Sequence, residues 1–299
     1  MARPTRVAAL AASAGVGALA YGALYENNAY TLRRFDVPVL TPGTRPIRLL
    51  HMSDLHITAR QDRKLEWIRG LAELEPDLVI NTGDTLSDPA GIPAVLRALE
   101  PLFAFPGAFV AGNNDYYAPR PKNPLRYFFP DSNRGHGSPL PWPELAAKLS
   151  ASGWLDLTHV RAALSMGAAG HIALAGTDDP HLRRARYARI AGAADPDAIV
   201  RIGVIHSPEP HLLGSFAADG YDLVLAGHTH GGQVRIPFGP ALVTNCGIDR
   251  ARARWLHRWD EHLYFHICAG IGSNPYTPVR IACRPEAALL TLVPRPAQP

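Results

Sequence analysis

A carboxylate and an imidazole stand two residues apart where an apolar run ends, in the segment Leu49-Leu50-His51-Met52-Ser53-Asp54-Leu55-His56. A strand through the apolar residues would place Asp54 and His56 on the same side, because side chains alternate along a strand. Oxygen and nitrogen ligands placed in this way can bind one cation together. A buried contact between the two side chains is the alternative, and this pair alone does not distinguish the two.

Four further apolar runs end in side chains of the same kind. Each run is short and β-rich, and most reach the polar residue through a glycine, which lets the backbone turn sharply. In chain order they end at Asp84, at Asn113-Asn114-Asp115, at His206 and at His228-Thr229-His230. Five strand ends of this kind are difficult to explain as core packing, and they favour a metal site built from all of them.

The ordered set D-x-H, G-D, G-N-x-D, H and G-H-T-H resembles the calcineurin-like metallophosphoesterases over about residues 45–294. The segments 174–181 and 231–233 are similar to the membrane-associated bacterial branch of that family. The resemblance implies an α/β fold, a four-layer αββα sandwich of two mixed β-sheets. It also implies a dinuclear centre in which Asp84 bridges two ions. The first ion would be held by Asp54, His56, Asp84 and His230, and the second by Asp84, Asn113, His206 and His228.

Ligands of this kind, without thiolate, suit manganese, iron or zinc and do not choose among them. The expected cofactors are therefore two divalent or trivalent metal ions. A hydroxide that bridges two cations is a nucleophile near neutral pH and can attack phosphorus in line. The expected activity is hydrolysis of phosphodiester or phosphoanhydride bonds, and no side-chain nucleophile is required.

Asn114 departs from the family pattern, which usually reads G-N-H-[DE] and places the histidine over the leaving group. An asparagine amide can donate a hydrogen bond but cannot supply a proton. We therefore expect a substrate whose leaving group is already a stable anion. His136, His181 or another histidine in space is the alternative. Asp115 would normally orient the missing histidine, so bracing Asn114 or its loop is the expected role.

The N-terminal residues 1–29 have the features of a signal anchor or a cleaved signal peptide, followed by a metallophosphoesterase domain over 30–299. Residues 7–25 carry no charge and are nearly as long as a membrane-spanning helix. Arg3 and Arg6 precede them, which favours an extracytoplasmic domain. The prediction is a single-pass anchor in the cell membrane; cleavage after Ala18-Leu19-Ala20 and an ordinary soluble helix are the alternatives.

The segment 116–143 is rich in proline and is interpreted as an active-site loop. Arg120, Lys122 and Arg126 are candidate contacts to a substrate phosphate, and the aromatic residues 127–129 are candidate contacts to a lipid. With the N-terminal segment and Asn114, they suggest a lipid-linked substrate. The alternatives are a broad soluble phosphodiesterase and a catalytically silent module that binds metal and recognises a partner or a lipid phosphate.

Composition adds only broad limits. The net charge of +4 mildly favours anionic partners, but no basic stripe is long enough to follow a nucleic-acid backbone. The three cysteines are far apart and are interpreted as free thiols. Hydrophobic periodicity predicts helices over 61–74, 92–102, 144–150, 182–191 and 209–218. Strands are expected over 30–39, 156–176 as a pair, 234–237, 263–268 and 288–293, besides those that end in the candidate ligands.

Overall fold

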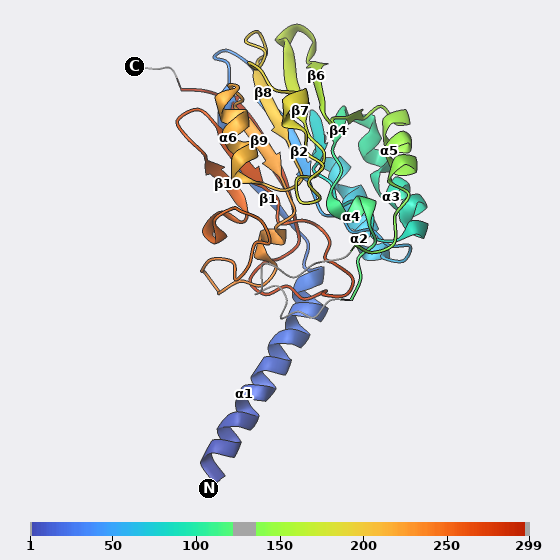
Figure 1. Cartoon of the computed structure of the whole chain (residues 1–299), viewed down its shortest axis with the longest axis vertical. Helices are drawn as coiled ribbons and strands as arrows, with labels where there is room; N and C mark the ends of the chain where they lie inside the picture. Colours follow the sequence, from blue (N-terminus) through green and yellow to red (C-terminus); the bar gives the residue numbers. More distant parts are fainter. Residues whose placement is uncertain (1, 122–135, 297–299) are drawn as a thin grey trace.

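The computed structural model describes residues 2–121 and 136–296, which form two β-sheets flanked by helices (Figure 1). The helices are α1 (Ala2–Ala20), α2 (Asp62–Gly70), α3 (Ile92–Leu99), α4 (Asn113–Tyr116), α5 (Trp142–Ala151) and α6 (Pro210–Ala218). The strands are β1 (Thr31–Leu40), β2 (Ile47–Met52), β3 (Leu78–Asn81), β4 (Gly107–Phe109), β5 (Leu155–Asp156), β6 (Val160–Ser165), β7 (His171–Gly176), β8 (Val200–Val204), β9 (Leu223–Ala226), β10 (Trp255–Arg258), β11 (Tyr264–Ile267) and β12 (Glu286–Pro294).

Both sheets are mixed. The first has the strand order β1-β12-β2-β3-β4-β5 and the second the order β10-β11-β9-β8-β7-β6. Strands β2, β3 and β4 run parallel in the first sheet, and β7, β8 and β9 run parallel in the second. Because the carboxyl ends of parallel strands meet at one edge, the loops that carry the candidate ligands gather at one end of the sandwich.

The alternation of apolar side chains explains why two sheets pack together. On β2, Leu49 belongs to the core between the sheets, while its neighbour Leu50 packs with the helices α2, α3 and α5. On β9, Leu225 faces the same inner core, while Val224 packs under α6. Each sheet is therefore buried on both faces, as parallel strands require. The four-layer sandwich of two mixed sheets is confirmed.

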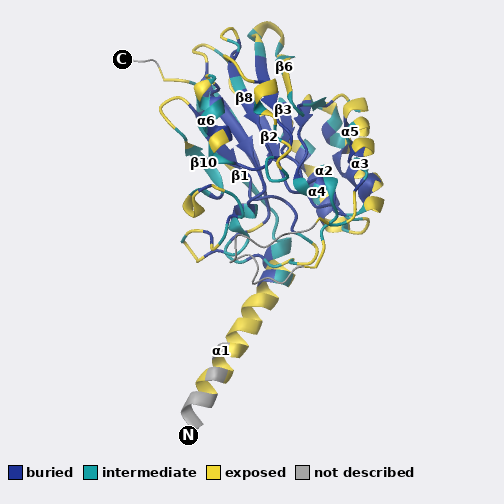
Figure 2. Ribbon diagram, viewed as in Figure 1, coloured by how far each residue is buried: buried dark blue, intermediate teal, exposed yellow. Residues whose placement is uncertain are grey.

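The prediction of an N-terminal membrane segment is not confirmed. Of the helices within residues 2–121 and 136–296, none is long and apolar enough to cross a membrane. Helix α1 consists largely of alanine and glycine and includes Arg3 and Arg6. Alanine and glycine gain little free energy from transfer to hydrocarbon, and arginine loses free energy. The helix therefore does not reach the hydropathy of a membrane-spanning helix. The expectation of a single-pass anchor in the cell membrane was therefore wrong, although α1 does project from the sandwich with most of its length exposed (Figure 2).

The residues that follow α1 pack onto the sandwich. A π-helical turn (Tyr21–Tyr25) and a 3-10 turn (Glu26–Asn28) lead into β1. The carbonyl of Gly22 accepts a hydrogen bond from the Arg280 amide at 3.2 Å. The buried carboxylate of Glu26 accepts one from the amide of Cys283 at 2.6 Å. The N-terminal segment therefore supports the loop between β11 and β12.

Two expected elements differ from the structure. The segment 182–191 holds only a 3-10 turn (Tyr187–Arg189), because the Asp179 carboxylate binds the amides of His181 and Leu182 and folds the chain into a loop. The segment 234–237 forms isolated bridges, Val234 with Ile281 and Arg235 with Ala241, rather than a strand. The other predicted strands and helices form within a few residues of their expected limits.

Candidate metal centre

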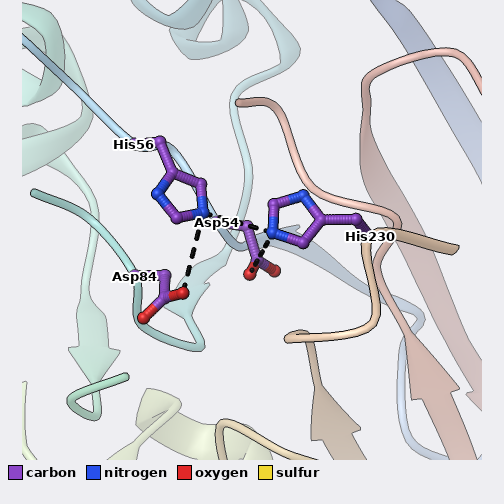
Figure 3. A group of neighbouring side chains, drawn as sticks. All are labelled: Asp54, His56, Asp84 and His230. Carbon is purple, nitrogen blue, oxygen red and sulfur yellow. Dashed lines mark hydrogen bonds and ion pairs between the residues drawn. The ribbon is translucent and has the colours of Figure 1, made fainter. Parts of the chain in front are cut away.

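The loops after β2, β3 and β9 bring Asp54, His56, Asp84 and His230 together (Figure 3). One ligand atom from each lies within 4.8 Å of the others. The Nε2 atom of His56 is 3.6 Å from Oδ2 of Asp84, and Nε2 of His230 is 3.4 Å from Oδ1 of Asp54. These are the four residues expected to hold the first ion.

A second group forms on the other side of Asp84. Its Oδ1 atom lies 3.4 Å from Nε2 of His206, and that nitrogen lies 3.2 Å from Nδ1 of His228. Asn113, at the start of α4, lines the same cavity as Asp84 and His228. Asp84 thus presents one carboxylate oxygen to each group.

The backbone at these positions is strained. Asp54, His56, Asp84, His228 and His230 all have positive φ, between 44° and 67°. Non-glycine residues rarely adopt this conformation, and they keep it only where the surrounding structure compensates its cost of about 1–3 kcal/mol each. Five of the seven expected ligands share this geometry. Sequence pattern indicated sharp turns at glycines, but not that the ligands themselves would carry the left-handed conformation.

Hydrogen bonds behind the ligands fix their orientation. Nδ1 of His206 donates to the carbonyl of Thr82 at 2.7 Å, which turns Nε2 toward Asp84. Nδ1 of His56 is 2.9 Å from Oγ of Ser87. Oδ2 of Asp54 accepts hydrogen bonds from Ser53 and from the amide of His228, so its Oδ1 is directed into the site.

Burial keeps most of the imidazoles neutral, which is the form that binds metal. It lowers the pKa of His56 to about 4 and takes the pKa values of His228 and His230 well below the usual range. His206 is the exception. Burial would lower its pKa, but the adjacent Asp84 carboxylate outweighs burial and raises it well above the usual range.

The two carboxylates differ. Burial raises the pKa of Asp54 to about 6. Burial would also raise the pKa of Asp84, but His206 and the hydrogen bond from Asn114 hold it below the usual range. Asp84 is therefore an anion at the point where the two groups meet.

The residues present fit metal ions. Oδ1 of Asp54 and Oδ1 of Asn113 are buried and have no hydrogen-bond partner among the described residues. Such atoms are costly to bury unless a partner such as a cation completes them. The Nε2 atoms of His56 and His230 face each other at 3.2 Å. This is close to the separation of two nitrogens that bind the same ion, each at a distance of about 2.1 Å. The donor set, its neutral imidazoles and its unpartnered oxygens all suit divalent cations.

The two candidate catalytic residues occupy different places. Asn114 lines the cavity and donates to Asp84 twice, from its amide to Oδ1 at 2.7 Å and from Nδ2 to Oδ2 at 2.6 Å. Asp115 is fully buried and accepts hydrogen bonds from the amides of Thr85, Leu86 and Gly112 at 2.8–3.0 Å. Asp115 thus ties the Asp84 loop to the Asn113 turn.

The candidate substrate contacts are only partly described. Arg120 lines the cavity, whereas Lys122 and Arg126 lie outside the described residues. Of the histidines considered as replacements for the missing acid, His181 lines the cavity and its ring lies 4.7 Å from that of His228. The ring of His136 stacks on Tyr117 at 4.4 Å.

Two buried basic side chains support the site from behind, and sequence pattern did not assign them this role. Lys64 donates to the carbonyls of Leu55 and His56 at 2.6 and 2.9 Å. Arg280 is fully buried and donates to the carbonyls of Ala269 and Gly272 at 2.9 and 2.6 Å. Lys64 lies on the apolar face of α2, and a lysine at that position is the signal that could have revealed it.

The calcineurin-like phosphoesterase family model matches residues 47–232. The chain is 30% identical to the uncharacterized protein YpbG of Bacillus subtilis, over 96% of this chain and 94% of that protein. It is 25% identical to the uncharacterized metallophosphoesterase YkuE of the same organism, over 92% and 94%. It is 26% identical to the phosphodiesterase YaeI of Escherichia coli, over 96% of both.

The chain therefore belongs to the calcineurin-like phosphoesterases, as the ordered ligand motifs indicated. Membership, together with the cluster around Asp84, makes it a metal-dependent phosphoester hydrolase.

Proposed function

We propose that this chain hydrolyses phosphodiester or phosphoanhydride bonds at a centre of two metal ions. The observation that carries the proposal is the shared carboxylate of Asp84, with one oxygen 3.6 Å from His56 and the other 3.4 Å from His206. A carboxylate in this position can bind two cations about 3.5–4 Å apart. Bound there, the ions would neutralise phosphate charge and activate a water.

The chain's own residues hold and shape the centre. Asp54, His56 and His230 would complete one ion's ligands, and Asn113, His206 and His228 the other's. Asn114 holds Asp84 through two hydrogen bonds and faces the cavity, so its amide can also donate to a phosphate oxygen. Arg120, on the cavity wall, can neutralise a second phosphate oxygen.

The preferred substrate has a leaving group that is stable as an anion. Asn114 cannot give up a proton, and a missing general acid typically costs about 10²–10⁴-fold when the leaving group must be protonated. A phosphoanhydride or an aryl phosphodiester avoids that cost. The lipid-linked substrate expected from the sequence remains part of this proposal, supported by Asn114 and by the cavity itself.

The test is manganese-dependent hydrolysis of bis-p-nitrophenyl phosphate beside p-nitrophenyl phosphate, with Asp84→Asn as the control. The full chain should be used, because residues 22–27 bind the loop between β11 and β12. Turnover of the diester that is lost in Asp84→Asn supports the proposal. A folded, metal-loaded chain that turns over neither ester would instead favour a silent binding module.

A further inference from the structure

One cavity of about 490 Å³ contains both the candidate metal ligands and an apolar wall. The polar side presents the ligand residues Asp84, Asn113 and His228. The apolar side is lined by Leu19, Val234, Leu242, Val243, Tyr276, Pro278 and Val279. A phosphate held at the polar side would therefore have one of its substituents against the apolar side.

Apart from Leu19, which lies on α1, the wall is built from two segments that are bound to each other. The first follows directly from His230, and the second lies between β11 and β12. Gln233 joins them: its side chain donates to the carbonyl of Val279 at 3.0 Å, and its own carbonyl accepts from the amide of Ile281 at 3.0 Å. Because this part of the wall begins at Val234, four residues after the candidate ligand His230, its position is fixed relative to the metal centre.

Arg235 also stabilises the wall without adding charge to the cavity. Its guanidinium donates to the carbonyls of Gly231 and Gly239 at 2.8 and 2.9 Å, and the side chain is buried. Among the residues described as lining the cavity, Arg120 carries the guanidinium and Asp84 the carboxylate, both on the polar side or its rim. The wall therefore carries no charge although the segment contains an arginine, and its apolar side chains alternate with uncharged polar ones such as Thr244 and Thr277.

Part of this apolar surface is exposed to water. Leu242 is 38% exposed and Tyr276 is 53% exposed. Apolar side chains beside a polar site are a common feature of ligand pockets, in which a few polar groups orient a ligand and apolar contacts bind it. The occupant that matches this arrangement has a phosphate at one end and a hydrocarbon at the other.

We propose that the wall binds an alkyl chain attached to the scissile phosphate, so that the substrate is an amphiphilic phosphodiester or phosphoanhydride. The inference rests on the proposed function, because it takes the phosphate to lie at the metal centre. It adds the identity of one substituent and the residues that select it. Each methylene placed against the wall is worth about a fourfold gain in binding, if burial is complete.

The test is a series of p-nitrophenyl alkyl phosphates with methyl, butyl and octyl groups, used below the concentration at which the octyl ester forms micelles. The leaving group is the same throughout, so only the alkyl chain varies. We expect kcat/KM of the manganese-loaded full chain to rise with chain length, mainly through a lower KM. A flat series would overturn the inference while leaving the proposed function intact.

Two variants test the location of the subsite. Each should be normalised to its own rate with the methyl ester. In Leu242→Asn and Tyr276→Asn we expect the gain per methylene to fall. Val160→Asn, which alters an apolar side chain of similar exposure (41%) on β6, is the matched control and should retain the wild-type series. An undiminished chain-length gain in both wall variants would place the alkyl chain elsewhere.

Failure of the proposed function is distinguishable. If no ester is hydrolysed, binding of methyl-, butyl- and octylphosphonate to the manganese-loaded chain can be measured by calorimetry. Affinity that rises with chain length and falls in Leu242→Asn would support the apolar subsite in a non-catalytic protein. Affinity that does not depend on chain length would overturn it there too.

Discussion

Gly227, in the turn after β9, lies against the side chains of Ser53 and Asp54, and Gly227→Ala should disable the metal centre. The added Cβ would lie 2.5 Å from Oδ2 of Asp54 and would overlap Oγ of Ser53. To restore the ordinary contact distance of 3.4 Å, the carboxylate must move by roughly 1 Å, well beyond the ±0.2 Å that a metal site tolerates.

A misplacement of about 1 Å typically costs about 10²-fold in rate, and overpacking a core costs about 1–3 kcal/mol. We therefore expect the manganese-dependent diesterase activity of Gly227→Ala to fall by at least about 10²-fold. The variant should remain folded, as judged by circular dichroism. Gly214→Ala is the matched control, because a Cβ there, on α6, meets nothing within 4 Å. Wild-type activity in Gly227→Ala would show that Asp54 does not hold a metal at this position.

Three further predictions concern proton and metal chemistry. His266 is buried, and burial lowers its pKa to about 3. In the unfolded chain this histidine takes up a proton below pH ~6.5, so its own contribution should lower the free energy of unfolding by about 2 kcal/mol from pH 7 to pH 5, in addition to the contributions of the other buried histidines. In urea titrations this loss should shrink in His266→Met and persist in His262→Gln, where the exposed histidine is replaced; an equal loss in both variants would contradict it. Asn114→His should raise the rate with alkyl leaving groups by about 10²-fold and that with p-nitrophenol far less, as measured by kcat for both ester types; equal changes would refute the leaving-group argument. Removal of metal with a chelator should lower the melting temperature by several degrees, because ions bind the folded chain preferentially, and calorimetry that shows no shift on reloading manganese would contradict this.

The fold and the gathering of Asp54, His56, Asp84 and His230 could be predicted because the signals for both are local in the sequence. Each ligand follows a short apolar strand, and the period of the apolar residues identifies the faces that form the core. Leu49 and Leu50 illustrate this, since neighbouring residues belong to different layers. The order of the motifs then supplied the family, and the family supplied the pairing of ligands.

The features that could not be predicted depend on tertiary contacts or, for the N-terminal helix, on whether its hydropathy is high enough for a membrane span. Arg280 is fully buried and donates to backbone carbonyls, which only the folded loop reveals. The segment 182–191 has a helical composition, but capping of its first amides by Asp179 favours a loop. For residues 7–25, length and lack of charge indicated an anchor, while the alanine and glycine content leaves the helix below the hydropathy of a membrane span.

The most direct test of the central claim is the number of manganese ions bound per chain, measured by inductively coupled plasma mass spectrometry after loading and desalting. The account predicts two ions in the wild-type chain and fewer in Asp84→Asn, because this residue contacts both ligand groups. It also predicts that diesterase activity falls with the ion count. Two ions retained in Asp84→Asn with full activity would contradict a centre bridged by Asp84.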